Sequence, residues 1–60
     1  MLNYFKTILT KVSFDKGLFE KELSKAVEKL TSNDLSELRN WCYINFSEYG
    51  DVLEKFFSSF

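Results

Sequence analysis

Cys42 is the only cysteine of this 60-residue chain, and the chain has no histidine. An internal disulfide is therefore impossible, and a zinc site of cysteine and histidine ligands cannot be built from these residues. A chain this short buries only about 60% of the surface that its unfolded form exposes, and folds of this size usually rely on a disulfide, a metal or another chain. Since the first two are excluded, we expect association with another chain to complete the core.

The composition favours association with a protein and argues against nucleic acid. Hydrophobic residues make up 45% of the chain and aromatic residues 18%, and aromatic side chains dominate both cores and interfaces. The net charge is −1, whereas domains that bind phosphate backbones carry a basic excess. Residues 1–30 carry +2 and residues 31–60 carry −3. Solvated helix faces alone can produce this asymmetry, but it can also orient two subunits head to tail.

The spacing of the apolar residues predicts helices. Proline, the strongest helix breaker, is absent, so the ends of the helices depend on their caps. Residues 3–12 form the first segment with helical periodicity. Its apolar stripe consists of Leu2, Phe5, Ile8, Leu9 and Val12. Several β-branched residues leave a strand as the alternative, but two adjacent apolar residues break the alternation that a strand requires, so we expect a helix.

Two residues suited to helix N-caps mark the next joints. Asp15 is expected to cap a second helix over residues 16–30, with Phe14 packing on Phe19 as a hydrophobic staple. Thr31 is expected to cap a third helix after a short turn. Because a short turn between helices places them side by side, the second and third helices should form an antiparallel hairpin.

The last segment has the clearest amphipathic pattern of the chain. Asp51 and Glu54 match a capping box for its start, with Ser47 as the competing cap. Its apolar face consists of Tyr49, Val52, Leu53, Phe56, Phe57 and Phe60. Together the segments predict an all-α fold, a small bundle of three to four short antiparallel helices. We expect residues 1–60 to form a single domain that is completed by dimerisation.

The segment from Leu30 to Phe46 contains the only tryptophan, cysteine and arginine of the chain. Helical spacing divides it into a core stripe and a second apolar surface. The core stripe consists of Leu35, Leu38, Cys42 and Phe46. The remaining apolar residues exceed what a body of this size can bury, and tryptophan, tyrosine and arginine are enriched at binding hot spots. We therefore predict a protein interface formed by Arg39, Trp41, Tyr43, Ile44, Phe57 and Phe60.

The sequence offers no catalytic or ligand-binding constellation. Cys42 lacks a histidine that could activate it, and a thiol on an apolar stripe is typical of a core residue. The carboxylates lie on predicted polar faces or caps, and no glycine-rich phosphate loop is present. We therefore expect a protein without enzymatic activity, metal, cofactor or small-molecule ligand, and with another copy of the chain or a different protein as its partner.

A membrane surface is the alternative partner. The apolar face of the first segment is bordered by Lys6 and Lys11, as in helices that lie at a membrane interface. The chain has no apolar run long enough to span a bilayer, and no signal peptide is apparent. The lone cysteine fits a reducing compartment. We therefore expect a small intracellular protein of the cytoplasm.

Overall fold

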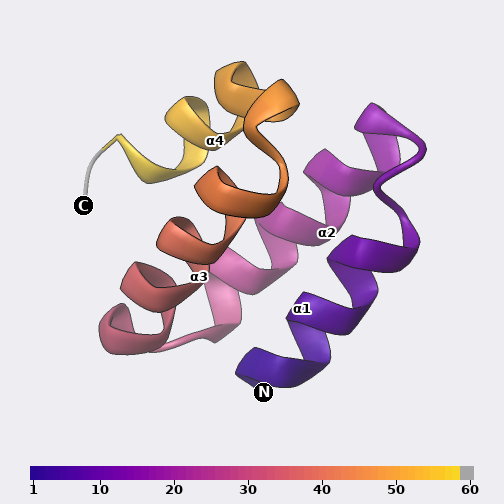
Figure 1. The fold of residues 1–60 in the computed structure, drawn as a ribbon. Coiled ribbons are helices and arrows are strands. Elements are labelled where there is room, and N and C mark those ends of the chain that lie inside the picture. Colours follow the sequence, from indigo (N-terminus) through magenta and orange to yellow (C-terminus); the bar gives the residue numbers. More distant parts are fainter. Residues whose placement is uncertain (59–60) are drawn as a thin grey trace.

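The fold is built from helices throughout the part of the chain that the structure describes. A computed structural model describes residues 1–58 (Figure 1), and their helices are α1 (Leu2–Lys11), α2 (Lys16–Lys29), α3 (Ser32–Asn45), a single 3₁₀ turn η1 (Ser47–Tyr49) and α4 (Gly50–Phe57). No strand occurs within residues 1–58. The all-α prediction is confirmed, and the strand alternative for residues 3–12 is wrong.

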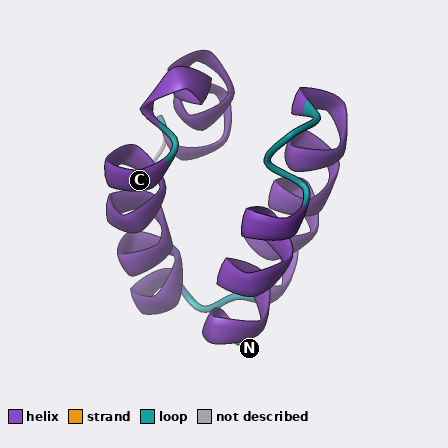
Figure 2. Ribbon diagram, turned by 45° about the vertical axis from the view of Figure 1, so that its right-hand side comes forward, coloured by secondary structure: helices purple, strands orange, loops and turns teal. Residues whose placement is uncertain are grey.

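Helices α1 and α2 lie side by side, α3 lies on the other side of the bundle and spreads away from them toward its C-terminal end, and α4 lies at that end. The α1–α2 connection and α4 lie at the upper end of Figure 1, and the N-terminus and the α2–α3 connection lie at the lower end. Helix α1 contacts α2 and α3, and α4 contacts α2 and α3. Figure 2 shows that the loops are short, so that nearly all of the described backbone is helical.

Two of the predicted N-caps form as expected. The Asp15 carboxylate accepts a hydrogen bond of 3.1 Å from the backbone N–H of Leu18. The Thr31 hydroxyl accepts one of 3.2 Å from the backbone N–H of Asp34. Each bond satisfies a donor that would have no partner within its own helix. The starts of α2 and α3 were therefore predictable from local chemistry.

Replacing Thr31 by alanine is expected to lower the free energy of unfolding by about 1 kcal/mol, because the Asp34 N–H loses its acceptor. Urea unfolding followed by circular dichroism measures the change. Ser32→Ala is the matched control, since Ser32 is an exposed residue at the next position. Equal losses in both variants would contradict the assignment of Thr31 as the cap.

The predicted start of the last helix is wrong. Helix α4 begins at Gly50 after the 3₁₀ turn, and neither Ser47 nor Asp51 provides a side-chain cap. Asp51 lies in the first turn of α4 and forms an ion pair with Lys16 of α2, which lowers the pKa of the Asp51 carboxyl and raises the pKa of the Lys16 ammonium. Tertiary contacts therefore determine where this helix starts.

The predicted hydrophobic staple is also wrong. The Phe14 side chain is 80% exposed, whereas Phe19 is fully buried. The carbonyl of Ser13 instead accepts a hydrogen bond from the hydroxyl of Tyr49, which belongs to η1. This bond connects the α1–α2 turn to η1, which directly precedes α4. The Phe14 side chain points into solvent.

The core is one cluster to which all four α-helices contribute. Its thirteen buried residues are Phe5, Leu9, Phe19, Leu23, Ala26, Leu30, Leu35, Leu38, Cys42, Phe46, Val52, Leu53 and Phe57. The predicted core stripe of the third helix is confirmed, since all four of its residues belong to this cluster. A single chain supplies every residue of the cluster. A core too small for one chain is therefore not a reason to expect dimerisation.

Candidate functional site

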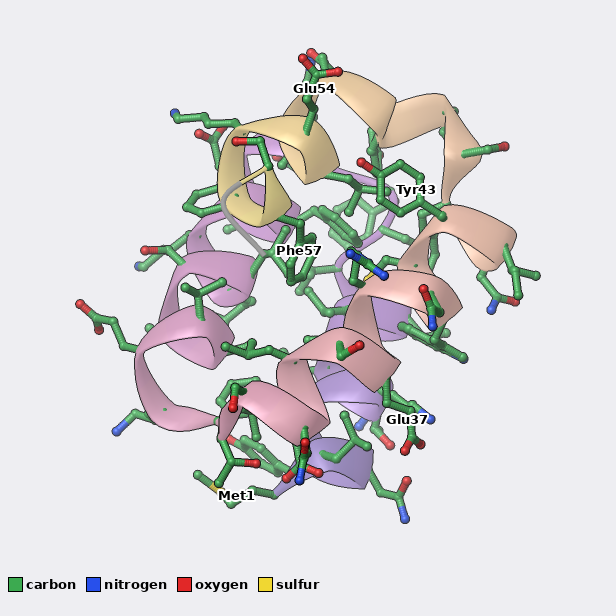
Figure 3. The ribbon with its side chains drawn as sticks, turned by 90° about the vertical axis from the view of Figure 1, so that its left-hand side faces the viewer. Met1, Glu37, Tyr43, Glu54 and Phe57 are labelled. Atoms are coloured by element: carbon green, nitrogen blue, oxygen red, sulfur yellow. The ribbon has the colours of Figure 1, made fainter. Side chains whose placement is uncertain are left out.

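The predicted interface residues differ in how far the structure exposes them. Ile44 is 80% exposed and Tyr43 is 44% exposed, whereas Arg39 and Trp41 are partly buried. Phe57 is buried in the core, and Figure 3 shows it directed from α4 into the bundle. Phe60 lies outside the described residues. Within residues 1–58, the exposed surface of the predicted interface therefore belongs to its four residues on α3.

These four residues do not form one surface, because helix geometry separates them. Residues two apart on an α-helix are turned by about 200° relative to each other. Trp41 and Tyr43 therefore point to opposite flanks of α3. Ile44 follows Trp41 by three residues and shares its flank, whereas Arg39 precedes Tyr43 by four residues and shares the other flank.

On the first flank, Trp41 lies beside a groove between α1 and α3. The groove has a volume of about 340 Å³ and is lined by Lys6, Thr7, Thr10, Lys11 and Trp41. Trp41 is thus the one aromatic residue of its lining, and the other lining residues are polar or charged side chains of α1. An aromatic residue partly exposed in a groove beside an exposed aliphatic residue is typical of an anchor for a partner side chain.

Lys6 fixes the position of the Trp41 ring. Its ammonium Nζ lies 5.8 Å from the centroid of the Trp41 ring and 3.4 Å from Oε2 of Glu37. The cation therefore contacts the face of the indole while it is paired with a carboxylate one turn before Trp41. Phe46 packs against the indole at 5.3 Å between ring centroids. The Trp41 side chain is thus held in place before any partner binds.

The other flank of α3 carries a more polar surface. Arg39 donates a hydrogen bond of 3.3 Å to the side-chain oxygen of Asn40, and it forms no ion pair within residues 1–58. Tyr43 is half exposed on the same flank. This pair offers a donor and an aromatic ring, and neither residue lines the α1–α3 groove.

Sequence analysis missed the residues of α1 that complete the first flank. Lys6, Thr7, Thr10 and Lys11 read as an ordinary polar face in the sequence, and only the packing of α1 against α3 brings them to Trp41. The spacing of these residues at i, i+1, i+4 and i+5 predicts a polar face of the helix. It does not show which helix packs beside that face. A groove between two helices depends on their packing.

The face of α1 predicted to meet a membrane is partly buried. Phe5 is 2% exposed and Leu9 is fully buried, because both belong to the core. These two residues of the predicted face therefore pack in the bundle, whereas Leu2 and Ile8 are partly exposed: an amphipathic stripe that suits an interfacial helix suits a bundle equally well. No helix within residues 1–58 combines the length and apolar character that a membrane span requires.

Cys42 is a core residue. It is fully buried, and this desolvation raises the pKa of its thiol to about 12, against a smaller opposing effect of the Lys6 charge. The thiol is therefore protonated at neutral pH, and the thiolate is the reactive form of cysteine. Among residues 1–58, no three side chains of the acidic, cysteine or histidine types come together in a way that could hold a metal ion.

Between α1 and α3 the described residues thus provide a groove that Trp41 lines, and the exposed Ile44 lies three residues after Trp41 on the same flank of α3. Comparison with protein-family models, with curated proteins and with solved structures found no match for this chain.

Proposed function

We propose that the chain is a non-enzymatic protein that acts by binding another polypeptide through the α1–α3 face. This face comprises the groove residues Lys6, Thr7, Thr10, Lys11 and Trp41, together with Ile44. The observation that carries the proposal is the exposure of Ile44, which is 80% accessible on a helix whose other flank residues are polar or packed. Burying an isoleucine side chain is worth about 1.5–3 kcal/mol, so an exposed one beside an anchoring groove favours association.

The proposed partner is a second copy of the chain. A two-fold dimer uses the same patch twice, so that one exposed isoleucine and one groove on each protomer are self-complementary. A typical stable interface buries about 800 Å² on each partner, and the chain exposes 3785 Å² in all. A dimer would therefore cover about a fifth of the surface.

The proposal includes three features inferred from sequence patterns. We infer an antiparallel order of α1, α2 and α3, because connections of four and two residues join them. We also infer a cytoplasmic location, which the free buried thiol of Cys42 fits. Arg39 and Tyr43, on the opposite flank of α3, are proposed as a lesser contact that Arg39→Ala tests in the same assay.

Replacing Ile44 by lysine is expected to weaken self-association by about 100-fold to 10,000-fold, because an apolar contact worth about 1.5–3 kcal/mol is lost on each of the two protomers. Lysine is a good helix former and is favourable near the C-terminus of α3, so the fold should be kept. Sedimentation velocity over a range of micromolar concentrations measures the effect. Trp41→Ala should weaken association in the same direction.

Phe14→Ser is the matched control, since Phe14 is also 80% exposed but lies in the α1–α2 turn, away from α3. It should leave the association constant unchanged. A wild-type chain that sediments as a monomer at every concentration would refute the homodimer. Equal weakening by Phe14→Ser and Ile44→Lys would show that exposed apolar surface in general, and not the α1–α3 face, drives association.

A further inference from the structure

The outer side of α1 and α2 carries a second group of exposed apolar side chains. Tyr4 is 60% exposed and Phe14 is 80% exposed, and Met1 and Leu18 are also exposed. All four belong to α1, α2 or their junctions. None of them lines the α1–α3 groove. Exposed apolar side chains therefore occur in two places, on α3 beside the α1–α3 groove and on the outer side of α1 and α2.

Helical spacing arranges these residues in two stripes. Met1, Tyr4, Ile8 and Lys11 follow one another by three or four positions along α1. Leu18, Lys21, Lys25 and Lys29 do the same along α2. A groove of about 480 Å³ is lined by Met1, Tyr4, Phe5, Glu22, Lys25 and Lys29. Since residues of both stripes line this groove, the stripes adjoin and form one surface, the α1–α2 face, with Phe14 at the turn end.

The lysines of this face differ from the other lysines of the chain. Lys6, Lys16 and Lys55 each form an ion pair with an acid of another helix, namely Glu37, Asp51 and Glu20. Lys25 pairs only with Glu22 of its own helix, at 3.4 Å. Lys11, Lys21 and Lys29 form no ion pair within residues 1–58. The cations that pair between helices therefore lie elsewhere. Lys21 and Lys29 belong to the α1–α2 face alone and are available to a ligand, whereas Lys11 borders both this face and the α1–α3 groove.

We propose that the α1–α2 face binds the surface of an anionic membrane. Exposed apolar side chains at both ends of the face can enter the boundary between head groups and acyl chains, while the lysines contact lipid phosphates. Lysine stems extend along apolar surface with their ammonium groups in water, which suits this arrangement. Charge complementarity selects the partner, because the four lysines of the two stripes outnumber the three acids beside them, Asp15, Glu22 and Glu28, of which Glu22 is paired with Lys25.

The side chains of the face favour lipid over nucleic acid or an acidic protein. Tyr4 and Phe14 provide rings, but they lie at opposite ends of the face and the residues that accompany them, Met1 and Leu18, are aliphatic, so the face has no row of rings on which successive bases could stack. Glu22 and Glu28 interrupt the line of lysines, so a continuous chain of phosphates would meet repulsion along it. Lipid head groups are separate and mobile, and can collect around individual lysines. The groove between Tyr4 and Lys29 can accept one such head group.

Flotation with vesicles tests the proposal on the intact chain. We expect binding to phosphatidylcholine vesicles that contain phosphatidylglycerol, little binding to pure phosphatidylcholine, and loss of binding at high salt. Lys21→Gln and Lys29→Gln should each lower the partition coefficient about fivefold. Lys55→Gln changes the net charge equally but lies on α4, and it should have a much smaller effect. Phe14→Ser should lower binding without a change in circular dichroism.

Two further results separate this proposal from the α1–α3 association. Ile44→Lys should leave vesicle binding unchanged, and the quenching of Trp41 fluorescence by acrylamide should be the same with and without vesicles, because Trp41 lies in the other groove. Absent binding, equal binding to neutral vesicles, or equal losses for Lys21→Gln, Lys29→Gln and Lys55→Gln would overturn the proposal. So would binding to single-stranded nucleic acid or an acidic polypeptide without binding to anionic vesicles.

Discussion

Replacing Phe19 by alanine is expected to unfold most of the chain. Phe19 is fully buried, and its ring lies 5.1 Å from that of Phe46 and 4.8 Å from that of Tyr49, measured between centroids. A buried phenylalanine replaced by alanine costs about 3–5 kcal/mol. A domain of this length has a total stability of about 3–9 kcal/mol. The loss is thus comparable to the whole stability.

The Phe19→Ala result can be read from circular dichroism and from the urea midpoint. Leu18→Ala is the matched control, because Leu18 is the adjacent residue of α2 and is exposed. Alanine is also a good helix former, so the control should stay close to wild type. A Phe19→Ala variant as stable as Leu18→Ala would mean that the aromatic cluster of α2, α3 and η1 is not the centre of the core.

The stability of the chain is expected to fall as the pH rises above about 9, in a way that depends on Cys42. Burial raises the pKa of the thiol from 9.0 to about 12 in the folded chain. The unfolded chain therefore releases this proton at lower pH than the folded chain does. Stability from this group is fully present below pH 9 and is lost as the pH rises, by up to about 1.4 kcal/mol per pH unit and about 4 kcal/mol in total.

Cys42→Ala isolates this contribution. The variant lacks the thiol, so its stability should start lower at neutral pH, because a buried side chain is truncated. Its stability should then fall less steeply than that of wild type between pH 9 and pH 11. Urea unfolding at several pH values gives both curves. Parallel curves would show that the Cys42 thiol ionises equally easily in the folded and unfolded chains, which would contradict its burial.

The helices could be predicted because their determinants are local. Apolar spacing of three and four residues and the caps at Asp15 and Thr31 act over one helical turn, and both are readable from the sequence. The core stripe on α3 follows from the same spacing. Leu35, Leu38, Cys42 and Phe46 share one side of the helix, and all are buried.

The features that were wrong or missed depend on contacts between helices. Asp51 has the sequence of a cap but pairs with Lys16, a residue 35 positions earlier. Phe14 has the sequence of a staple but is exposed, and the neighbouring carbonyl of Ser13 accepts a hydrogen bond from Tyr49, a residue 36 positions later. Neither partner could be identified before the packing of α2 against α4 was known.

The candidate surfaces were only partly predictable for the same reason. The sequence placed Trp41 and Ile44 outside the core stripe, which agrees with their positions in the structure. It placed Phe5 and Leu9 on the apolar stripe of the first helix, and both are buried, but it could not show that α1 would border Trp41. The exposed side of an amphipathic helix is known only once its neighbours are placed.

We propose that one chain completes its own core and that the exposed Ile44 serves association with a second chain. Urea unfolding of Ile44→Lys, measured at widely different protein concentrations, tests it most directly. The account predicts a cooperative transition with a midpoint that does not depend on concentration, since the thirteen core residues come from one chain. An unfolded Ile44→Lys variant, or a midpoint that rises with its concentration, would show that a second chain completes the core and would contradict the account.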